Sequence, residues 1–159
     1  MALARADSEL SRAGNAALRR DWTYRASAVR AYLSLARGNS DALARFQELS
    51  DTLCMGCYVD RLTKARLFDS LGMHADAEAA LKERPHTMIT PLEVVVANER
   101  SALAEKLQHY DLAARAYEFV GRAWSSGDPT LRARATQAAA KAGQLAGDQP
   151  QRARLAPDR

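Results

Sequence analysis

The two cysteines of the chain, Cys54 and Cys57, form a C-x-x-C motif directly before a predicted helix. A helix N-terminus favours the thiolate, so a redox pair is physically possible at this position. Thioredoxin-type chemistry uses a strand-to-helix turn, however, and the sequence predicts no strands. A zinc site needs two further ligands, whereas His74, His86 and His109 fall on separate turns without paired spacing. A local disulfide and a reduced pair packed in the loop are the two favoured interpretations.

The redox state of this motif also bears on localisation. The sequence leaves cytoplasmic and extracytoplasmic compartments open, and an oxidised Cys54–Cys57 pair would favour the extracytoplasmic one. The N-terminal segment MALARADSELSRAG lacks the apolar region of a signal peptide. The sequence holds no Gly-rich phosphate loop, no nucleophile next to a base and no metal cluster. We therefore expect a protein without enzymatic activity or cofactor.

The composition favours an all-α domain. Of 159 residues, 47% are hydrophobic and 26% are charged, with alanine and leucine dominating the apolar set. These residues have high helix propensity, and the β-branched residues that favour strands are scarce. No run approaches the roughly 18 apolar residues of a membrane span, so we expect no transmembrane segment. The net charge of +4 is spread among acidic residues, which favours a solvated surface over a nucleic-acid interface.

Caps and helix breakers divide the chain into eight predicted helices with short connections. We expect them at about Ala2–Arg19, Trp22–Arg37 with Asp21 as its cap, Asp41–Ser50, Tyr58–Leu71, Ala75–Arg84, Pro91–Leu107, Asp111–Trp124 and Pro129–Leu145. Residues 1–146 would form one helical domain. Residues 147–159 are polar, contain two prolines and would form a loose tail.

A repeat runs through these helices. Gly38 and Gly72 are 34 residues apart (72 − 38), and a third copy aligns if Gln108 takes the glycine position 36 residues later (108 − 72). Each copy has a small residue before the turn, a small residue after it, and a large apolar residue four positions further on. In chain order the three sets are Ala31, Ala42 and Phe46; Ala65, Ala77 and Leu81; Ser101, Ala113 and Tyr117. A leucine, Leu33, Leu67 or Leu103, stands five positions before each turn. Small residues opposite large ones allow two antiparallel helices to pack closely, which predicts stacked helical hairpins.

The pattern resembles the tetratricopeptide repeat (TPR) family from about Tyr24 to Asp128. The resemblance implies a right-handed solenoid of about three helix pairs with flanking capping helices. More loosely, residues 35–67 are similar to TPR regions attached to bacterial serine/threonine kinases and transcriptional regulators. The sequence lacks the large aromatic early in each first helix and the proline that closes each repeat in that family.

The resemblance also implies a function, namely a scaffold that binds a protein or peptide. First helices line the inner surface of such solenoids, where Asn, Arg and Lys often hold an acidic peptide. The corresponding candidates here are Arg61, Lys64, Asn98 and Arg100. Ordinary solvated side chains are the alternative interpretation for all four.

A second functional hypothesis is structural. The two ends of a solenoid can stack on each other, and such a heterologous contact propagates into a filament or closes into an oligomer. Aromatic residues gather near both ends: Trp22, Tyr24 and Tyr32 at one and Trp124 at the other. They either plug the core or, where exposed, anchor an interface. A redox or metal protein remains the third hypothesis, and it depends on Cys54 and Cys57 alone.

Overall fold

The computed structural model describes residues 2–12, 14, 16–49, 57–82 and 91–155, and within these residues it is all-helical without strands. Eight helices follow one another in the described parts of the chain. They are α1 (Ala2–Arg12), α2 (Ala16–Ala36), α3 (Ala42–Gln47), α4 (Cys57–Ser70), α5 (His74–Lys82), α6 (Pro91–Lys106), α7 (Tyr110–Trp124) and α8 (Pro129–Leu155). The predicted class and most predicted helix boundaries agree with this order.

The N-terminal boundary differs from the prediction. The segment expected as one helix, residues 2–19, is divided, because α1 ends at Arg12 and α2 begins at Ala16. Gly14 lies between the two helices, and glycine is a poor helix former. Asp21, the predicted cap, lies inside α2 instead, where its carboxylate accepts a hydrogen bond from Arg25 Nε at 2.8 Å.

The C-terminal helix is longer than predicted. Asp128 caps it as expected, because Asp128 Oδ1 accepts hydrogen bonds from the backbone N–H groups of Thr130 at 2.8 Å and Leu131 at 3.0 Å. The predicted end at Leu145 is wrong, however, since α8 continues to Leu155. Of the predicted tail, residues 147–155 belong to this helix, and the remaining residues lie outside the described part of the chain. Pro150 favours a break by its residue type, because proline lacks the backbone N–H and its ring clashes with the preceding turn, but α8 continues past it.

Three helices end in the same left-handed turn. Gly38 and Gly72 have φ values of 67° and 76°, and Gln108 has a φ of 61°. At all three ends the next N–H donates to the carbonyl five positions earlier: Asn39 to Ser34 at 3.0 Å, Met73 to Phe68 at 2.9 Å and His109 to Ala104 at 2.8 Å. This is the Schellman pattern of a helix C-terminus. Gln108 therefore takes the position of the two glycines, as the sequence alignment predicted.

The small and large residues of the sequence repeat lie in the core. All six small residues are buried, and so are the three large ones that follow them, Phe46, Leu81 and Tyr117. One of the three predicted leucines does not follow the pattern, because Leu33 is 37% exposed whereas Leu103 is buried. The small residues let neighbouring helices approach closely. The large residues of those helices pack into the space beside the small ones.

Neighbouring helices share these core residues in clusters. One cluster joins α2 and α3, a second joins α4, α5 and α6, and a third joins α6, α7 and α8. Leu67 of α4 packs against the first cluster and so links it to the second. Each helix contacts its neighbour in sequence, and α4 also contacts α6.

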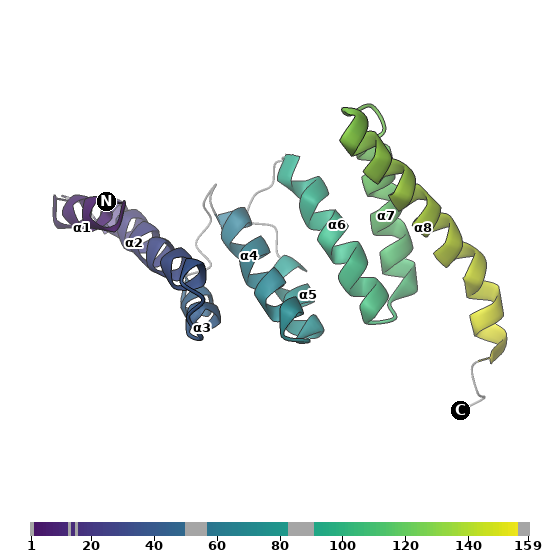
Figure 1. Ribbon diagram of the computed structural model, residues 1–159, viewed down its shortest axis with the longest axis horizontal. Helices are drawn as coiled ribbons and strands as arrows, with labels where there is room; N and C mark the ends of the chain where they lie inside the picture. Colours follow the sequence, from purple (N-terminus) through teal and green to yellow (C-terminus); the bar gives the residue numbers. More distant parts are fainter. Residues whose placement is uncertain (1, 13, 15, 50–56, 83–90, 156–159) are drawn as a thin grey trace.

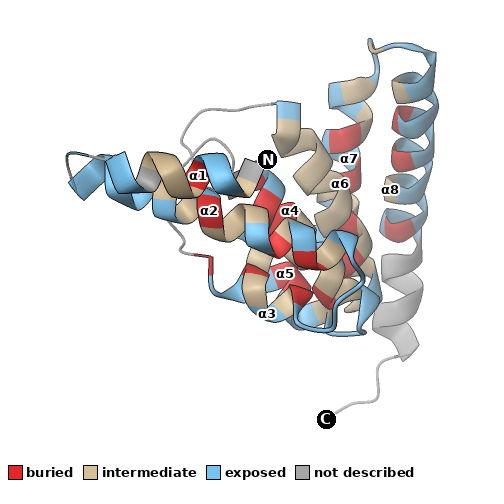
Figure 2. Cartoon of the chain, turned by 60° about the vertical axis from the view of Figure 1, so that its left-hand side comes forward, coloured by how far each residue is buried: buried red, intermediate tan, exposed pale blue. Residues whose placement is uncertain are grey.

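The helices form a row, with α1 and α8 at opposite ends (Figure 1). Buried residues lie on the sides of the helices that face their neighbours, and exposed residues lie on the outer sides (Figure 2). None of the helices described is both long and apolar enough to cross a bilayer.

Candidate interaction surfaces

The four residues predicted to line a peptide groove lie on α4 and α6 and differ in their exposure. Arg61 is only 8% exposed, whereas Lys64 is partly exposed. Asn98 and Arg100 are two residues apart on α6, which places them about 200° apart around the helix axis. Arg100 lines a hollow between α5, α6 and α7. Peptide binding by any of the four stays a prediction.

Two of the predicted interface aromatics instead join α2 to α4. The hydroxyls of Tyr24 and Tyr32 both donate to the buried carboxylate of Asp60, and the bond from Tyr32 measures 2.8 Å. Burial, followed by the hydrogen bond to Asp60, raises the pKa of Tyr24. Burial also raises the pKa of Tyr32 to about 12. These hydroxyls therefore stabilise the α2–α4 contact. The sequence analysis missed Asp60, which lies 36 residues after Tyr24.

The two tryptophans differ in their environment. Trp22 is partly exposed on α2, and the guanidinium carbon of Arg25 lies 5.3 Å from its ring centroid. Trp124, at the end of α7, packs against the core cluster of α6, α7 and α8. Trp124 is thus partly buried against the core, and its role as an interface anchor stays a prediction.

The C-x-x-C motif spans the boundary of the described residues at the start of α4. Cys54 lies outside the described residues, and Cys57 is described only as the first residue of α4. The predicted disulfide therefore stays a prediction. Within the described parts of the chain, no three His, Cys, Asp or Glu side chains are grouped to hold a metal ion.

Ion pairs connect α4 to α6 and α6 to α8. Arg66 pairs with Glu99 at 2.6 Å, Lys106 with Asp69 at 2.7 Å and Lys141 with Glu105 at 2.7 Å. The partners are 33, 37 and 36 residues apart, close to the period of the repeat. Each ion pair is partly exposed and contributes little to the free energy of unfolding by itself. Together the three pairs join alternate helices of the row.

Asp69 is the meeting point of three helices. Its carboxylate, near the end of α4, accepts hydrogen bonds from Lys106 at the end of α6 and lies 2.8 Å from His74 Nδ1 at the start of α5. The hydrogen bonds from Lys106, and then those from His74, hold the pKa of Asp69 below its usual range. The carboxylate therefore stays ionised and keeps the three helix ends together.

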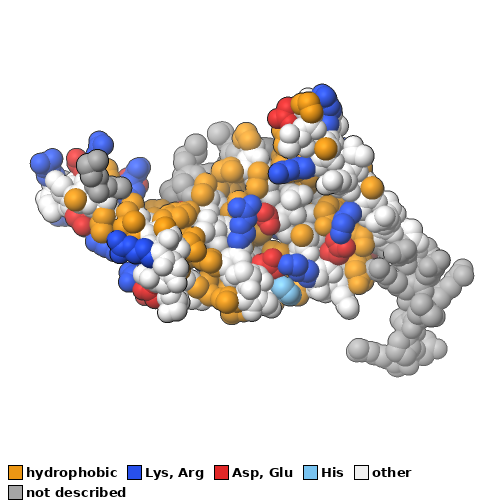
Figure 3. Space-filling model, in the orientation of Figure 1, with side chains coloured by type: hydrophobic (Ala, Val, Ile, Leu, Met, Phe, Trp, Pro, Cys, Tyr) orange, Lys and Arg blue, Asp and Glu red, His pale blue; other side chains and the backbone are white. Residues whose placement is uncertain are grey.

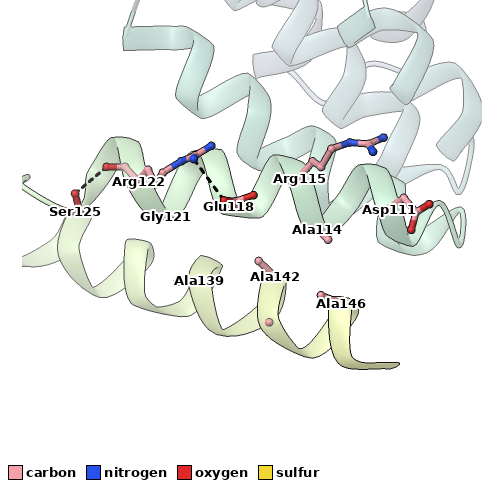
Figure 4. Close-up of a pocket in the computed structure, with 11 residues that line it drawn as sticks. Asp111, Ala114, Arg115, Glu118, Gly121, Arg122, Ser125, Ala139, Ala142 and Ala146 are labelled. Atoms are coloured by element: carbon pink, nitrogen blue, oxygen red, sulfur yellow. Dashed lines mark hydrogen bonds and ion pairs between the residues drawn. The ribbon is translucent and has the colours of Figure 1, made fainter. Parts of the chain in front are cut away.

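A groove of about 850 Å³ lies between α7 and α8. It is lined by Asp111, Ala114, Arg115, Glu118, Gly121, Arg122 and Ser125 of α7 and by Ala139, Ala142, Gly143 and Ala146 of α8 (Figure 4). All of the lining residues from α8 are alanine or glycine. The charged residues all belong to α7, where Glu118 and Arg122 form an ion pair at 3.4 Å.

Close contact between the two helices shapes one end of this groove. A Cβ atom on Gly121 would lie 3.3 Å from the carbonyl oxygen of Ala135 and 3.4 Å from Cβ of Ala139. The helices approach closely there because no side chain separates them. The residues further along, Ala142, Gly143 and Ala146, have short side chains and leave the groove open.

A second hollow, of about 290 Å³, lies between α5, α6 and α7. Its charged residues include Glu78, Glu93, Arg100 and Arg115, and its apolar residues include Leu112 and Phe119. The Glu78 carboxylate is buried and lies 3.3 Å from Lys82 Nζ. Acidic and basic groups are therefore both present, and Figure 3 likewise shows Lys and Arg interspersed with Asp and Glu on the face it draws.

Comparisons of the chain with protein-family models, with curated proteins and with solved structures give no match. The grooves and the contacts between helices are thus the features from which a function follows. A groove with small residues on one wall and charged residues on the other suits a helix better than a small molecule, because it lets a helix backbone approach closely.

Proposed function

We propose that the protein is a non-enzymatic, TPR-like scaffold that binds a helical segment of a partner protein in the groove between α7 and α8. The single observation that carries this proposal is the open groove of about 850 Å³, with only Ala and Gly on its α8 wall. A groove of this kind matches the helix-in-groove mode of protein recognition.

The TPR-like architecture is supported by three repeated features. The same left-handed turn follows α2, α4 and α6, at Gly38, Gly72 and Gln108. The small and large residues of the repeat are buried in each copy. Ion pairs between residues 33 to 37 positions apart connect α4 to α6 and α6 to α8. A solenoid of stacked hairpins accounts for all three, since each copy packs only on its neighbours.

The position of the groove in the row favours a helix as its occupant. α6 contacts both α5 and α7, and α7 contacts both α6 and α8. In the part of the chain that is described, no further helix follows α8. A helix laid between α7 and α8 would thus continue the packing of the row. The short side chains of Ala142, Gly143 and Ala146 permit the interaxial distance of about 8–10 Å at which helices pack.

The lining residues also indicate the chemistry of the partner. Short side chains in the groove require larger apolar side chains from the partner to fill the space. Asp111, Arg115, Glu118 and Arg122 offer both signs of charge along one edge. We therefore expect an amphipathic helix with leucine-like residues on one face and both acidic and basic residues beside them.

A display library of helical peptides, selected on the purified chain, tests the proposal. The enriched peptides are then measured against the wild type and two variants of α8. Ala146 is exposed and lines the groove, so A146W fills the groove. Ala140 is exposed on the same helix but is not a lining residue, so A140W is the matched control. We expect A146W to weaken binding at least about tenfold, which is about 1.4 kcal/mol, and A140W to leave it unchanged.

Circular dichroism of both variants shows whether the helices are retained. Equal affinity of the selected peptides for A146W and A140W, with both variants folded, would contradict binding in this groove. Displacement of the selected peptides by peptides that contact only α2 and α4 would also contradict binding in this groove.

A further inference from the structure

The hollow between α5, α6 and α7 has an apolar wall that is open to water. Leu112 and Phe119 of α7 line this hollow of about 290 Å³, and these side chains are 44% and 38% exposed. Val96 and Ala97 of α6 line it as well and are partly buried. Ligand pockets in proteins are mostly apolar and measure about 300–1,000 Å³. The hollow lies at the lower end of this range, so it suits a small molecule rather than a helix.

Two arginines in the same hollow have no partner for their charge. Arg100 of α6 and Arg115 of α7 are both lining residues. Within the described part of the chain, neither guanidinium group takes part in an ion pair or a hydrogen bond. A guanidinium group binds a carboxylate through two parallel hydrogen bonds, and such a contact is stronger beside an apolar wall than in open water. The hollow therefore offers two vacant carboxylate-binding groups.

The two carboxylates that line the hollow, in contrast, are already engaged. Glu78 of α5 lies 3.3 Å from Lys82 Nζ and 3.8 Å from His109 Nδ1. Glu93, at the start of α6, accepts a hydrogen bond from the Tyr58 hydroxyl at 2.8 Å. With Lys82 counted, the cationic groups outnumber the carboxylates. The charge left unsatisfied at the hollow is thus positive, which favours an anionic ligand.

The two arginines lie at nearly the same level of the α6–α7 hairpin. Arg100 comes eight residues before the turn at Gln108 (108 − 100), and Arg115 comes seven residues after it (115 − 108). In two antiparallel helices this difference of one residue is an offset of about 1.5 Å along the axis. Leu112 and Phe119 stand three residues before and four residues after Arg115, on the same face of α7. The positive charge therefore lies between two apolar side chains.

We propose that this hollow binds a small apolar carboxylate, with Arg100 and Arg115 holding the carboxylate and Leu112 and Phe119 contacting the apolar part. The phenyl ring of Phe119 also favours an aromatic ligand, because aromatic rings pack well against each other. Phenylacetate combines a carboxylate with one such ring and is the simplest probe of this chemistry. The proposal is a second binding site, and it does not depend on helix binding in the α7–α8 groove.

A titration of the purified chain with phenylacetate, followed by the NMR shifts of the backbone amides, tests the proposal. Two other probes separate the contributions of the ligand: phenylacetamide lacks the charge, and acetate lacks the ring. R100Q removes one guanidinium group, and glutamine keeps a high helix propensity at this position. R134Q is the matched control, because Arg134 is exposed on α8 and lines neither the hollow nor the groove. Circular dichroism shows that both variants keep their helices.

We expect saturable binding of phenylacetate with a dissociation constant at or below about 1 mM, and shifts centred on residues 96–100 and 112–119. Phenylacetamide and acetate should each bind at least about tenfold more weakly. R100Q should weaken phenylacetate binding by at least about tenfold, and R134Q should leave it unchanged. No saturation by phenylacetate up to about 10 mM would overturn the proposal. Equal affinity for phenylacetamide would overturn it too, and so would wild-type affinity in folded R100Q.

The same variants separate this site from the groove. Arg115 lines both the hollow and the groove, so the test uses Arg100, which lines the hollow alone. A146W should bind phenylacetate as the wild type does, and R100Q should bind the selected helical peptides as the wild type does. Loss of phenylacetate binding in folded A146W, or shifts centred on residues 139–146, would place the carboxylate in the groove and overturn the proposal.

Discussion

Gln108 ends α6 in the same left-handed backbone conformation in which Gly72 ends α4, with φ values of 61° and 76°. The hydrogen bonds that follow are also equivalent, from His109 to Ala104 and from Met73 to Phe68. Glycine adopts this conformation without steric cost, whereas a residue with a Cβ atom does so at a cost of about 1–2 kcal/mol. One of three equivalent turns is thus strained.

Replacing Gln108 by glycine should remove this strain. We expect Q108G to raise the free energy of unfolding by about 0.5–1 kcal/mol, since the gain is partly offset by the greater freedom of glycine in the unfolded chain. The reverse change, G72Q, should lower it by a similar amount. No heavy atom lies within 4 Å of a Cβ placed on Gly72, so the backbone alone is tested. Urea denaturation measures both values, and destabilisation by Q108G would contradict the prediction.

The hydroxyl of Tyr32 stabilises the contact between α2 and α4. Y32F removes its hydrogen bond to Asp60 but keeps the ring, which lies edge-on to Phe46 with centroids 5.0 Å apart. The expected loss in the free energy of unfolding is about 1–2 kcal/mol, because the acceptor is a buried carboxylate. Chemical denaturation of Y32F checks this value. An unchanged stability would show that the hydroxyl is satisfied equally well by solvent.

The same contact predicts a loss of stability at alkaline pH. Burial raises the pKa of Tyr32 to about 12, from the ordinary tyrosine value of about 10. Between these values the unfolded chain loses the proton while the native state keeps it. The stabilisation is therefore complete below pH 10 and decreases as the pH rises towards 12. Thermal unfolding across this range should show a smaller decrease for Y32F than for the wild type. Parallel curves for the two proteins would contradict the assignment.

Gly121 and Gly143 should respond to substitution in opposite directions. G121V places a branched side chain against the backbone of Ala135 and the Cβ of Ala139, where a Cβ atom alone already lies at 3.3–3.4 Å. We expect a loss of about 1–3 kcal/mol from this overpacking. At Gly143, no heavy atom lies within 4 Å of an added Cβ, so G143A should gain up to about 1 kcal/mol from helix propensity. Thermal unfolding of both variants provides the comparison, and a neutral G121V would refute the close α7–α8 contact.

Local signals were sufficient to predict most helices. The ends of α2 and α4 were predicted from the glycines of their turns, and the start of α8 was predicted from the cap at Asp128. These signals act within a few residues of the helix end. The alignment of Gln108 with the glycines came from the repeat rather than from its own type. The break before Ala16 and the extension of α8 to Leu155 were not predicted. Glycine and proline lower the local helix propensity, but the residue type alone does not decide whether a helix ends there.

The candidate surfaces were harder to predict than the helices. Arg61, Lys64, Asn98 and Arg100 were grouped because the first helices of TPR-like solenoids line the inner surface, but two positions along a helix turn a side chain by about 200°. The pairing of Tyr24 and Tyr32 with Asp60 depends on how α2 packs on α4, which no local pattern specifies. The groove between α7 and α8 likewise arises from short side chains on α8, which read in the sequence only as helix formers.

Amide hydrogen exchange with and without a selected helical peptide is the most direct test of the proposed scaffold function. The account predicts that the added protection is concentrated in α7 and α8, around residues 111–125 and 139–146, and that A146W abolishes it. Protection centred on α2 and α4, with α7 and α8 unchanged, would contradict helix binding in the α7–α8 groove.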